Sequence, residues 1–312
     1  MRFSRLAFFV IVLFFTMTAS SSAQTKNIAI TIDDLPLNGP HIPIGDLQKM
    51  TKQFIDTLRK NDVPAVGFVN ESLLYVKGET DERISLLRSW SDGGVELGNH
   101  TFGHVGFSNT PLDKYEDDFV RGDAVTSRIV KGSGKTVRYF RHPFLQMGPT
   151  LETERAFEKF IGDRGYRIAP ITLSSSDWMF LVAYDRAKKS GDKTAVKKVA
   201  DDYIHFAEAN LEYGEKASNE IFGRQISHIL LLHANELTSD NLEGLIAIFK
   251  AHGYKFVTLE SVLNDPVYAF PEKYSPTSDW LQHWAFSKGK KLDAPEPPDY
   301  IQKAYVDAQV AK

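Results

Sequence analysis

The 312-residue sequence contains no cysteine. This absence excludes disulfide bonds, thiolate-ligated metals and cysteine nucleophiles, so any bound metal must be held by histidine, aspartate or glutamate. A large charge excess is also missing, because 37 basic residues face 40 acidic ones for a net charge of −3. Such a balance gives no electrostatic reason to bind DNA, RNA or an anionic membrane. With 42% hydrophobic and 25% charged residues, the composition is that of a globular chain and excludes collagen, coiled coil and wholesale disorder.

A long apolar run occurs near the N-terminus, over residues 6–15, behind Arg2 and Arg5 and ahead of small polar residues that end at Ala23. This order is typical of a secretory signal peptide, so we expect residues 1–23 to be cleaved and the protein to be exported to a bacterial periplasm or secreted. The run is shorter than the roughly 20 residues of a membrane span. We therefore expect no stable span after cleavage, with an uncleaved anchor as the alternative.

Apolar, β-rich runs alternate with amphipathic stretches along the rest of the chain. The first predicted strand covers residues 27–32, and the first predicted helix runs from about 46 to 61. Further strands are predicted at 65–69, 95–98, 137–141, 167–172, 229–233 and 255–259. Six or seven strand–helix units in one chain predict an α/β fold with a parallel sheet, and they favour a (β/α) barrel over an open sheet.

Two segments depart from this alternation. Residues 179–226 are longer than one crossover needs, and we predict an inserted helical excursion there that could wall a substrate groove. After Asn264 the chain becomes rich in proline and aromatic residues, and residues 266–312 are predicted to be a packed C-terminal extension.

Polar residues with catalytic potential gather at the ends of the predicted strands, where parallel barrels carry their catalytic loops. The first strand ends in Asp33 and Asp34. At a bend, two adjacent carboxylates can reach one pocket, where one can ligate a metal while the other handles a proton. The same pair is also a common turn or cap sequence.

A second strand end carries His100 and His104, four positions apart. On one helical turn, or on a tight loop closed by Gly103, their imidazoles can converge on one ion. A structural pair that caps a helix is the alternative.

Four further residues complete the set: Arg141 and His233 at later strand ends, with Asp177 and Trp178 between them. An arginine beside a carboxylate can hold it ionised, and a buried histidine beside an aspartate can stay protonated enough to act as an acid. Taken singly, Arg141, Trp178 and His233 are better explained as a surface ion pair, core packing and a satisfied buried imidazole.

Taken together and in this order, the elements resemble the polysaccharide deacetylase family, the NodB-homology group of carbohydrate esterase family four. The resemblance spans roughly residues 27–259. It is carried by Thr31-Ile-Asp33-Asp34, His100-Thr101-x-x-His104, Arg141-His-Pro143-Phe144, Asp177-Trp178 and Leu231-x-His233. It implies a distorted (β/α) barrel of about seven strands, with the NodB-homology domain over residues 24–265.

The resemblance implies a metal site formed by Asp34, His100 and His104. Two imidazoles and one carboxylate suit Zn²⁺, and such a site can also accept Co²⁺, Ni²⁺ or Mn²⁺.

The resemblance also implies the catalytic roles. Asp33 would be the general base, paired with Arg141, and His233 would be the general acid, held as imidazolium by Asp177. The backbone N–H of Phe144 would stabilise the tetrahedral oxyanion. Trp178 and Leu231 would form the apolar pocket for the acetyl methyl group.

Three positions depart from the family pattern. Ile32 replaces the usual phenylalanine of the first motif, Leu145 replaces a glycine after Phe144, and Ser174 or Ser175 replaces an aspartate ahead of Asp177. The second change can reshape the groove, and the third leaves the surroundings of His233 less determined.

The sequence therefore predicts an exported, metal-dependent deacetylase of an acetylated polysaccharide or oligosaccharide. N-deacetylation of the amino sugars of peptidoglycan, a chitin-like polymer or an exopolysaccharide is favoured. The alternatives are a hydrolase of another amide, imide or O-acetyl ester, and a non-catalytic glycan-binding relative.

Overall fold

The computed structural model describes residues 25–270 and 279–310, so the predicted signal peptide lies outside the described residues. Every described strand pairing is parallel, and the strand order is β5-β4-β3-β2-β1-β7-β6, with β8 pairing the first residues of β1. The strands are β1 (Lys26–Leu35), β2 (Ala65–Val69), β3 (Glu96–Asn99), β4 (Tyr139–Phe140), β5 (Arg167–Ile168), β6 (Leu173–Ser174), β7 (His228–His233) and β8 (Tyr254–Phe256).

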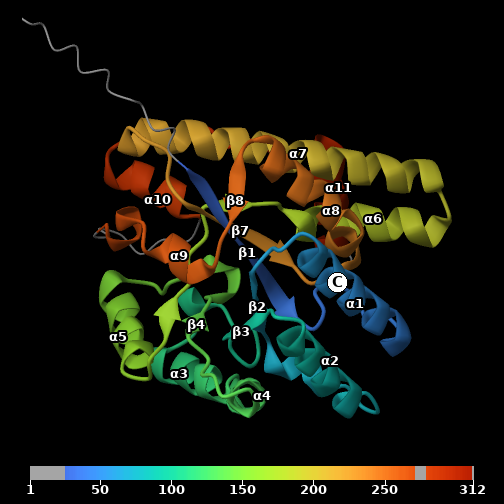
Figure 1. Ribbon diagram of the computed structural model, residues 1–312, viewed down its shortest axis with the longest axis horizontal. Helices are drawn as coiled ribbons and strands as arrows, with labels where there is room; N and C mark the ends of the chain where they lie inside the picture. The colour runs from blue at the N-terminus through green and yellow to red at the C-terminus, as the bar shows by residue number, and fades with distance from the viewer. Residues whose placement is uncertain (1–24, 271–278, 311–312) are drawn as a thin grey trace, which may run out of the picture.

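Helices surround this curled sheet (Figure 1). The α-helices are α1 (Ile44–Lys60), α2 (Thr80–Asp92), α3 (Leu112–Arg121), α4 (Ala124–Gly132), α5 (Leu151–Gly162), α6 (Asp177–Ser190), α7 (Lys193–Phe222), α8 (Glu236–Ala251), α9 (Leu259–Leu263), α10 (Trp280–Ser287) and α11 (Asp299–Val310). Short 3₁₀ turns are η1 (Glu71–Leu74), η2 (Phe107–Asn109), η3 (Pro143–Leu145) and η4 (Pro266–Ala269). The predicted α/β class and distorted barrel of about seven strands are confirmed.

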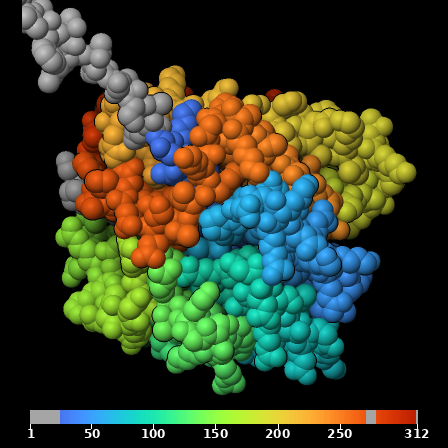
Figure 2. All heavy atoms as spheres, viewed as in Figure 1, coloured from blue at the N-terminus to red at the C-terminus, as the bar shows by residue number. Residues whose placement is uncertain are grey.

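The central strand β1 is buried along its last eight residues, and its two faces pack in two separate hydrophobic clusters: Ile28, Ile30 and Ile32 in one, Ala29 in the other. On one side, Phe54 of α1 packs against Trp90 of α2, with ring centroids 5.3 Å apart. In Figure 2, residues of the C-terminal half lie directly against the first helices on the visible face. The larger hydrophobic cluster contains buried residues from both halves of the sequence, those of β1 among them.

The prediction of one strand over 167–172 is wrong. The N–H of Ala169 donates to Phe140, whereas the N–H of Thr172 donates to Ile229, so the segment changes pairing partner within a few residues. Pro170 lies at the change, and it has no N–H with which to continue the ladder. Strands β5 and β6 are the two edge strands of the sheet. The segment that joins them therefore connects the two edges of the half-barrel by the polypeptide chain itself, without hydrogen bonds between β5 and β6.

Two other predicted strands are shorter than expected. Pairing in the segment 137–141 is confined to Tyr139–Phe140. The last predicted strand, 255–259, ends at Phe256 because Thr258 accepts a hydrogen bond from the N–H of Ser261 and begins α9.

The segment 179–226 contains most of α6 and the 30-residue α7, and its interpretation as an insertion stays a prediction. Beyond the barrel, Trp284 of α10 is fully buried against Phe222, and the N–H of Trp280 donates to Ile171. The division of the chain at residues 265 and 266 stays a prediction. Within residues 25–270 and 279–310, no helix is long and apolar enough to cross a membrane.

Candidate metal and catalytic site

The predicted site residues meet at one edge of the sheet. Asp33 and Asp34 are among the last three residues of β1, His100 follows β3, Arg141 follows β4, and His233 ends β7. Because all these strands run parallel, their carboxyl ends lie together, as in other parallel barrels.

A distortion at the end of β1 brings both carboxylates to the same imidazole. Asp34 adopts a left-handed conformation with φ of 61°, and the pairing with β2 shifts between Ile32 and Leu35. Adjacent side chains on a regular strand would point to opposite faces. Here the Nε2 atom of His100 lies 3.6 Å from Oδ2 of Asp33 and 3.6 Å from Oδ1 of Asp34.

The second histidine lies on a tight loop and not on a helical turn. Thr101 and His104 both have positive φ, and the hydroxyl of Thr101 accepts a hydrogen bond from the N–H of His104. The Nε2 atom of His104 lies 3.5 Å from Oδ1 of Asp34. One ligand atom from each of Asp34, His100 and His104 lies within 4.8 Å of the others.

These three residues fit a divalent cation. Within the described part of the chain, Oδ1 of Asp34 is buried and has no hydrogen-bond partner, while Oδ2 accepts a hydrogen bond from Asn38 at 2.7 Å. The Nδ1 atom of His100 is 2.7 Å from the carbonyl oxygen of Arg141; it therefore carries the proton, and the lone pair of Nε2 is free to ligate. Burial lowers the pKa of His100 and of His104, which keeps both rings in the neutral form that metals bind.

Arg141 is buried beside Asp33. Its Nη1 atom donates to both carboxylate oxygens, at 3.2 and 3.4 Å, so the pair is not a two-nitrogen fork. The other guanidinium nitrogens donate to the carbonyl of Ala169 and the hydroxyl of Thr31. Burial raises the pKa of Asp33 to about 6, although the charges of Arg141 and His233 lower it.

His233 and Asp177 form a second charged pair. Nδ1 of His233 lies 2.7 Å from Oδ1 of Asp177, whose Oδ2 accepts hydrogen bonds from the N–H of His233, from Thr238 and from Asn235. Burial lowers the pKa of His233, but the Asp177 carboxylate more than offsets this and the pKa rises to about 9. His233 is therefore an imidazolium at neutral pH.

The two pairs lie on neighbouring strands. Asp33 and His233 are direct partners in the β1–β7 pairing, and the N–H of Ala234 donates to the carbonyl of Asp33. The carboxyl group of Asp33 and the protonated imidazole of His233 therefore lie beside each other at the strand ends that carry the candidate metal ligands. This arrangement can accept a proton on one side and donate one on the other.

The three predicted substrate-binding residues differ in their surroundings. Phe144 has φ of 56° and is 59% exposed, and its ring centroid lies 4.4 Å from that of His104. Leu231 is buried on β7, two residues before His233. Trp178 is half-buried, and its ring packs edge-on against Tyr305 of α11. Their roles stay predictions.

The departure at Ser174 and Ser175 does not leave the site incomplete. The hydroxyl of Ser175 donates to the carbonyl of Leu231, and the hydroxyl of Ser174 accepts from the N–H of Ser176. Asp177 is satisfied by its other partners instead.

Sequence reasoning did not assign Asn38, Asn235 or Thr238 to these carboxylates. A local signal exists for Asn235, because its side chain caps α8 by accepting from the N–H of Thr238. This capping residue lies two positions after the strand-end His233, and both Asn235 and Thr238 donate to Asp177.

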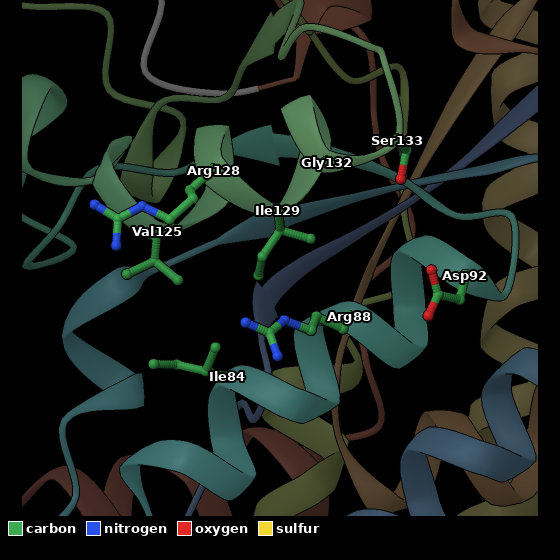
Figure 3. Close-up of a pocket in the computed structure, with 8 residues that line it drawn as sticks. All are labelled: Ile84, Arg88, Asp92, Val125, Arg128, Ile129, Gly132 and Ser133. Atoms are coloured by element: carbon green, nitrogen blue, oxygen red, sulfur yellow. The ribbon is translucent and has the colours of Figure 1, made fainter.

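The hollow shown in Figure 3 lies elsewhere, between α2 and α4, and has a volume of about 400 Å³. None of the predicted site residues lines it. Its lining residues are Ile84, Arg88, Asp92, Val125, Arg128, Ile129, Gly132 and Ser133.

Comparison with known proteins agrees with the motifs. Residues 20–158 match the family model described as polysaccharide deacetylase. Over these residues the match confirms the resemblance to the polysaccharide deacetylase family. It is 22% identical over 250 residues to a peptidoglycan-N-acetylglucosamine deacetylase of Bacillus cereus, which covers 78% of this chain and 70% of the relative. It is 24% identical over 244 residues to a chitin deacetylase of Colletotrichum lindemuthianum, which covers 78% of this chain and 81% of the relative.

A solved structure of this deacetylase family also shares the fold. It is a mutant of a CE4 family pseudoenzyme, with a TM-score of 0.51 and 18% identity, covering 77% of this chain and 68% of that chain. The likeness supports the barrel architecture alone.

The close approach of Gly122 to the histidine loop generates a first prediction. A Cβ atom at Gly122 would lie 2.4 Å from the backbone carbon of Thr101 and 2.5 Å from the nitrogen of Phe102. We expect Gly122→Ala to displace the loop and reduce the metal bound per chain, measured by elemental analysis after dialysis against Zn²⁺. Gly132→Ala is the matched control because a Cβ there meets nothing within 4 Å. Equal metal content in both variants would contradict the prediction.

The pairing of His233 with Asp177 generates a second prediction. Because the Asp177 carboxylate is what raises the pKa of His233 to about 9, Asp177→Asn should lower that pKa and leave the ring neutral at a pH where the wild-type ring is protonated. Nuclear magnetic resonance titration of the histidine ring measures this directly. Asp185→Asn, on the same helix α6, should leave the titration unchanged.

Proposed function

We propose that the protein is an exported, metal-dependent deacetylase of an acetylated glycan, with the N-acetyl group of an amino sugar as the favoured substrate. The observation that carries the proposal is the placement of a carboxylate and an imidazolium on neighbouring strands beside a three-ligand cluster. Amide hydrolysis needs these three parts together: a base for water, an acid for the leaving nitrogen and a positive centre for the carbonyl.

Asp34, His100 and His104 would hold the cation. When bound there, a divalent ion such as Zn²⁺ polarises the acetyl carbonyl and lowers the pKa of water. The unpartnered Oδ1 of Asp34 and the neutral, oriented ring of His100 support this ligand set.

Asp33 would act as the general base. Arg141 holds its carboxylate in place, and both Asp33 and Asp34 lie equally close to His100, so the base is next to the cation ligands. Asp33 accepts a proton from the attacking water, whose oxygen forms the new bond to the acetyl carbon.

His233 would act as the general acid. An amine must leave protonated, because an amide anion is a very poor leaving group. As the carbon–nitrogen bond breaks, His233 gives its Nε2 proton to the departing nitrogen, and Asp177 stabilises the imidazolium beforehand. The products are acetate and the free amino sugar.

The substrate class comes from the relatives. One is a peptidoglycan-N-acetylglucosamine deacetylase and another is a chitin deacetylase, and both names describe polymers of N-acetylated sugars. The competing functions are hydrolysis of another amide, imide or O-acetyl ester, and glycan binding without turnover. A pure binder has no need for Asp33 and His233 together, which favours the enzyme.

Acetate release from a panel of polymers tests the proposal. We expect release from peptidoglycan, chitooligosaccharides or poly-N-acetylglucosamine, loss of release with a chelator and recovery with Zn²⁺ or Co²⁺. Acetate release from acetylated xylan, which carries O-acetyl groups, would show whether the protein also cleaves O-acetyl esters. Glycan binding without acetate release under any condition would instead support the non-catalytic function.

Matched substitutions of the adjacent carboxylates separate the two proposed roles. Asp33→Asn should keep its metal and lose about 100- to 10,000-fold in kcat, the usual contribution of a general base. Asp34→Asn should lose both metal and activity, because a neutral amide oxygen is a weaker ligand than a carboxylate. Elemental analysis and initial rates on one substrate measure both effects. The assignment is wrong if the two variants retain equal amounts of metal.

A further inference from the structure

We infer that the C-terminal helix α11 completes the substrate site, and that Tyr305 is a positioning residue that fixes the Trp178 indole and thereby sets which acyl group is accepted. The inference rests on the proposed function and on the acyl-pocket role of Trp178 that the family resemblance implies. It extends that function to a segment that lies outside the residues matched by the family model, which end at 158.

Helix α11 packs along α6. Ile301 and Ala304 are buried in α11, and the carbonyl of Ala304 accepts a hydrogen bond from Arg186 of α6 at 3.4 Å. Ile301 is three positions before Ala304 and four before Tyr305, so these side chains lie on neighbouring parts of one face of α11. Through Tyr305, this face contacts Trp178 at the start of α6.

The start of α6 is the proposed acid side of the site. The N–H of Trp178 donates to Oδ1 of Asp177 at 2.8 Å, and the same oxygen pairs with Nδ1 of His233 at 2.7 Å. The backbone of Trp178 is therefore one hydrogen bond away from the carboxylate that orients the general acid. The indole of Trp178 forms no hydrogen bond with the residues that the structure describes.

Tyr305 supplies the anchor for the indole. The ring centroids of Trp178 and Tyr305 lie 4.7 Å apart with an interplanar angle of 77°, an edge-to-face pair. Among the described residues, Tyr305 is the aromatic side chain packed against Trp178, and both are half-buried. Without this ring, a half-buried indole gains rotamers and the proposed pocket widens.

A second tyrosine on α11 has a separate attachment and serves as the matched control. The hydroxyl of Tyr300 donates to Asp202 of α7 at 2.6 Å, and the ammonium group of Lys198 lies 4.3 Å from the Tyr300 ring. This contact fastens α11 to α7, away from Trp178. Substitution of either Tyr300 or Tyr305 would therefore loosen α11 in general. A change in acyl selection should follow from substitution of Tyr305 and not of Tyr300.

The experiment compares acetyl and propionyl release from matched N-acylated chitooligosaccharides. Tyr305→Ala and Trp178→Ala should each raise the propionyl-to-acetyl ratio of kcat/KM by about two- to tenfold, the range expected for one aromatic pair. Tyr305→Phe should restore the wild-type ratio because the ring remains, and Tyr300→Ala should not change it. Tyr305→Leu keeps apolar volume without the ring and replaces Tyr305→Ala if circular dichroism shows that the latter is unfolded.

The double variant decides whether Tyr305 acts through Trp178. In the Trp178→Ala background, Tyr305→Ala should cause no further change in the ratio. An altered ratio in Trp178→Ala with an unaltered ratio in Tyr305→Ala overturns the inference and leaves the proposed function intact. An unaltered ratio in both single variants overturns the acyl-pocket assignment and the inference with it, while absence of any acyl release from the wild type overturns the proposed function itself.

Discussion

Two adjacent buried carboxylates at the end of β1 are the constraint on which the rest of the site depends. Asp33 and Asp34 are 2% and 7% exposed, and burial of two like charges side by side is costly unless each is compensated. Arg141 compensates the first, and a cation shared with His100 and His104 would compensate the second. Arg141 follows β4, and the two histidines lie on the loop after β3. The sheet must therefore bring the ends of β1, β3 and β4 to one point.

The compensation of Asp33 is tied to closure of the barrel. Besides pairing with Asp33, the guanidinium of Arg141 donates to the carbonyls of Ala169 and Pro170, in the segment that crosses from one end of the strand order to the other. Carbonyls in an unpaired crossing segment would otherwise be buried without donors. One side chain therefore satisfies both the closing segment and the candidate base, which explains why Arg141 itself is buried despite its charge.

The sequence predicted those parts of the structure that local pattern controls. The alternation of apolar and amphipathic segments predicted the strands. The order of the motifs predicted that Asp33, Asp34, His100 and His104 lie at their ends. What it could not predict depends on contacts between distant segments. The split of 167–172 follows from pairing with β4 and β7 on opposite sides of Pro170. The packing of Tyr305 on Trp178 joins residues more than 120 positions apart, with no motif at the second position.

Burial acts in opposite directions on the two proposed proton-transfer groups, and their different partners decide the outcome. It raises the pKa of the Asp33 carboxyl to about 6, because the Arg141 charge offsets only part of the desolvation. It would lower that of His233, but Asp177 raises it to about 9. Between these values the base is ionised while the acid is protonated, which is the combination that hydrolysis requires. A cation held by Asp34 would add positive charge beside both groups and lower both pKa values, so this interval would move toward acid pH.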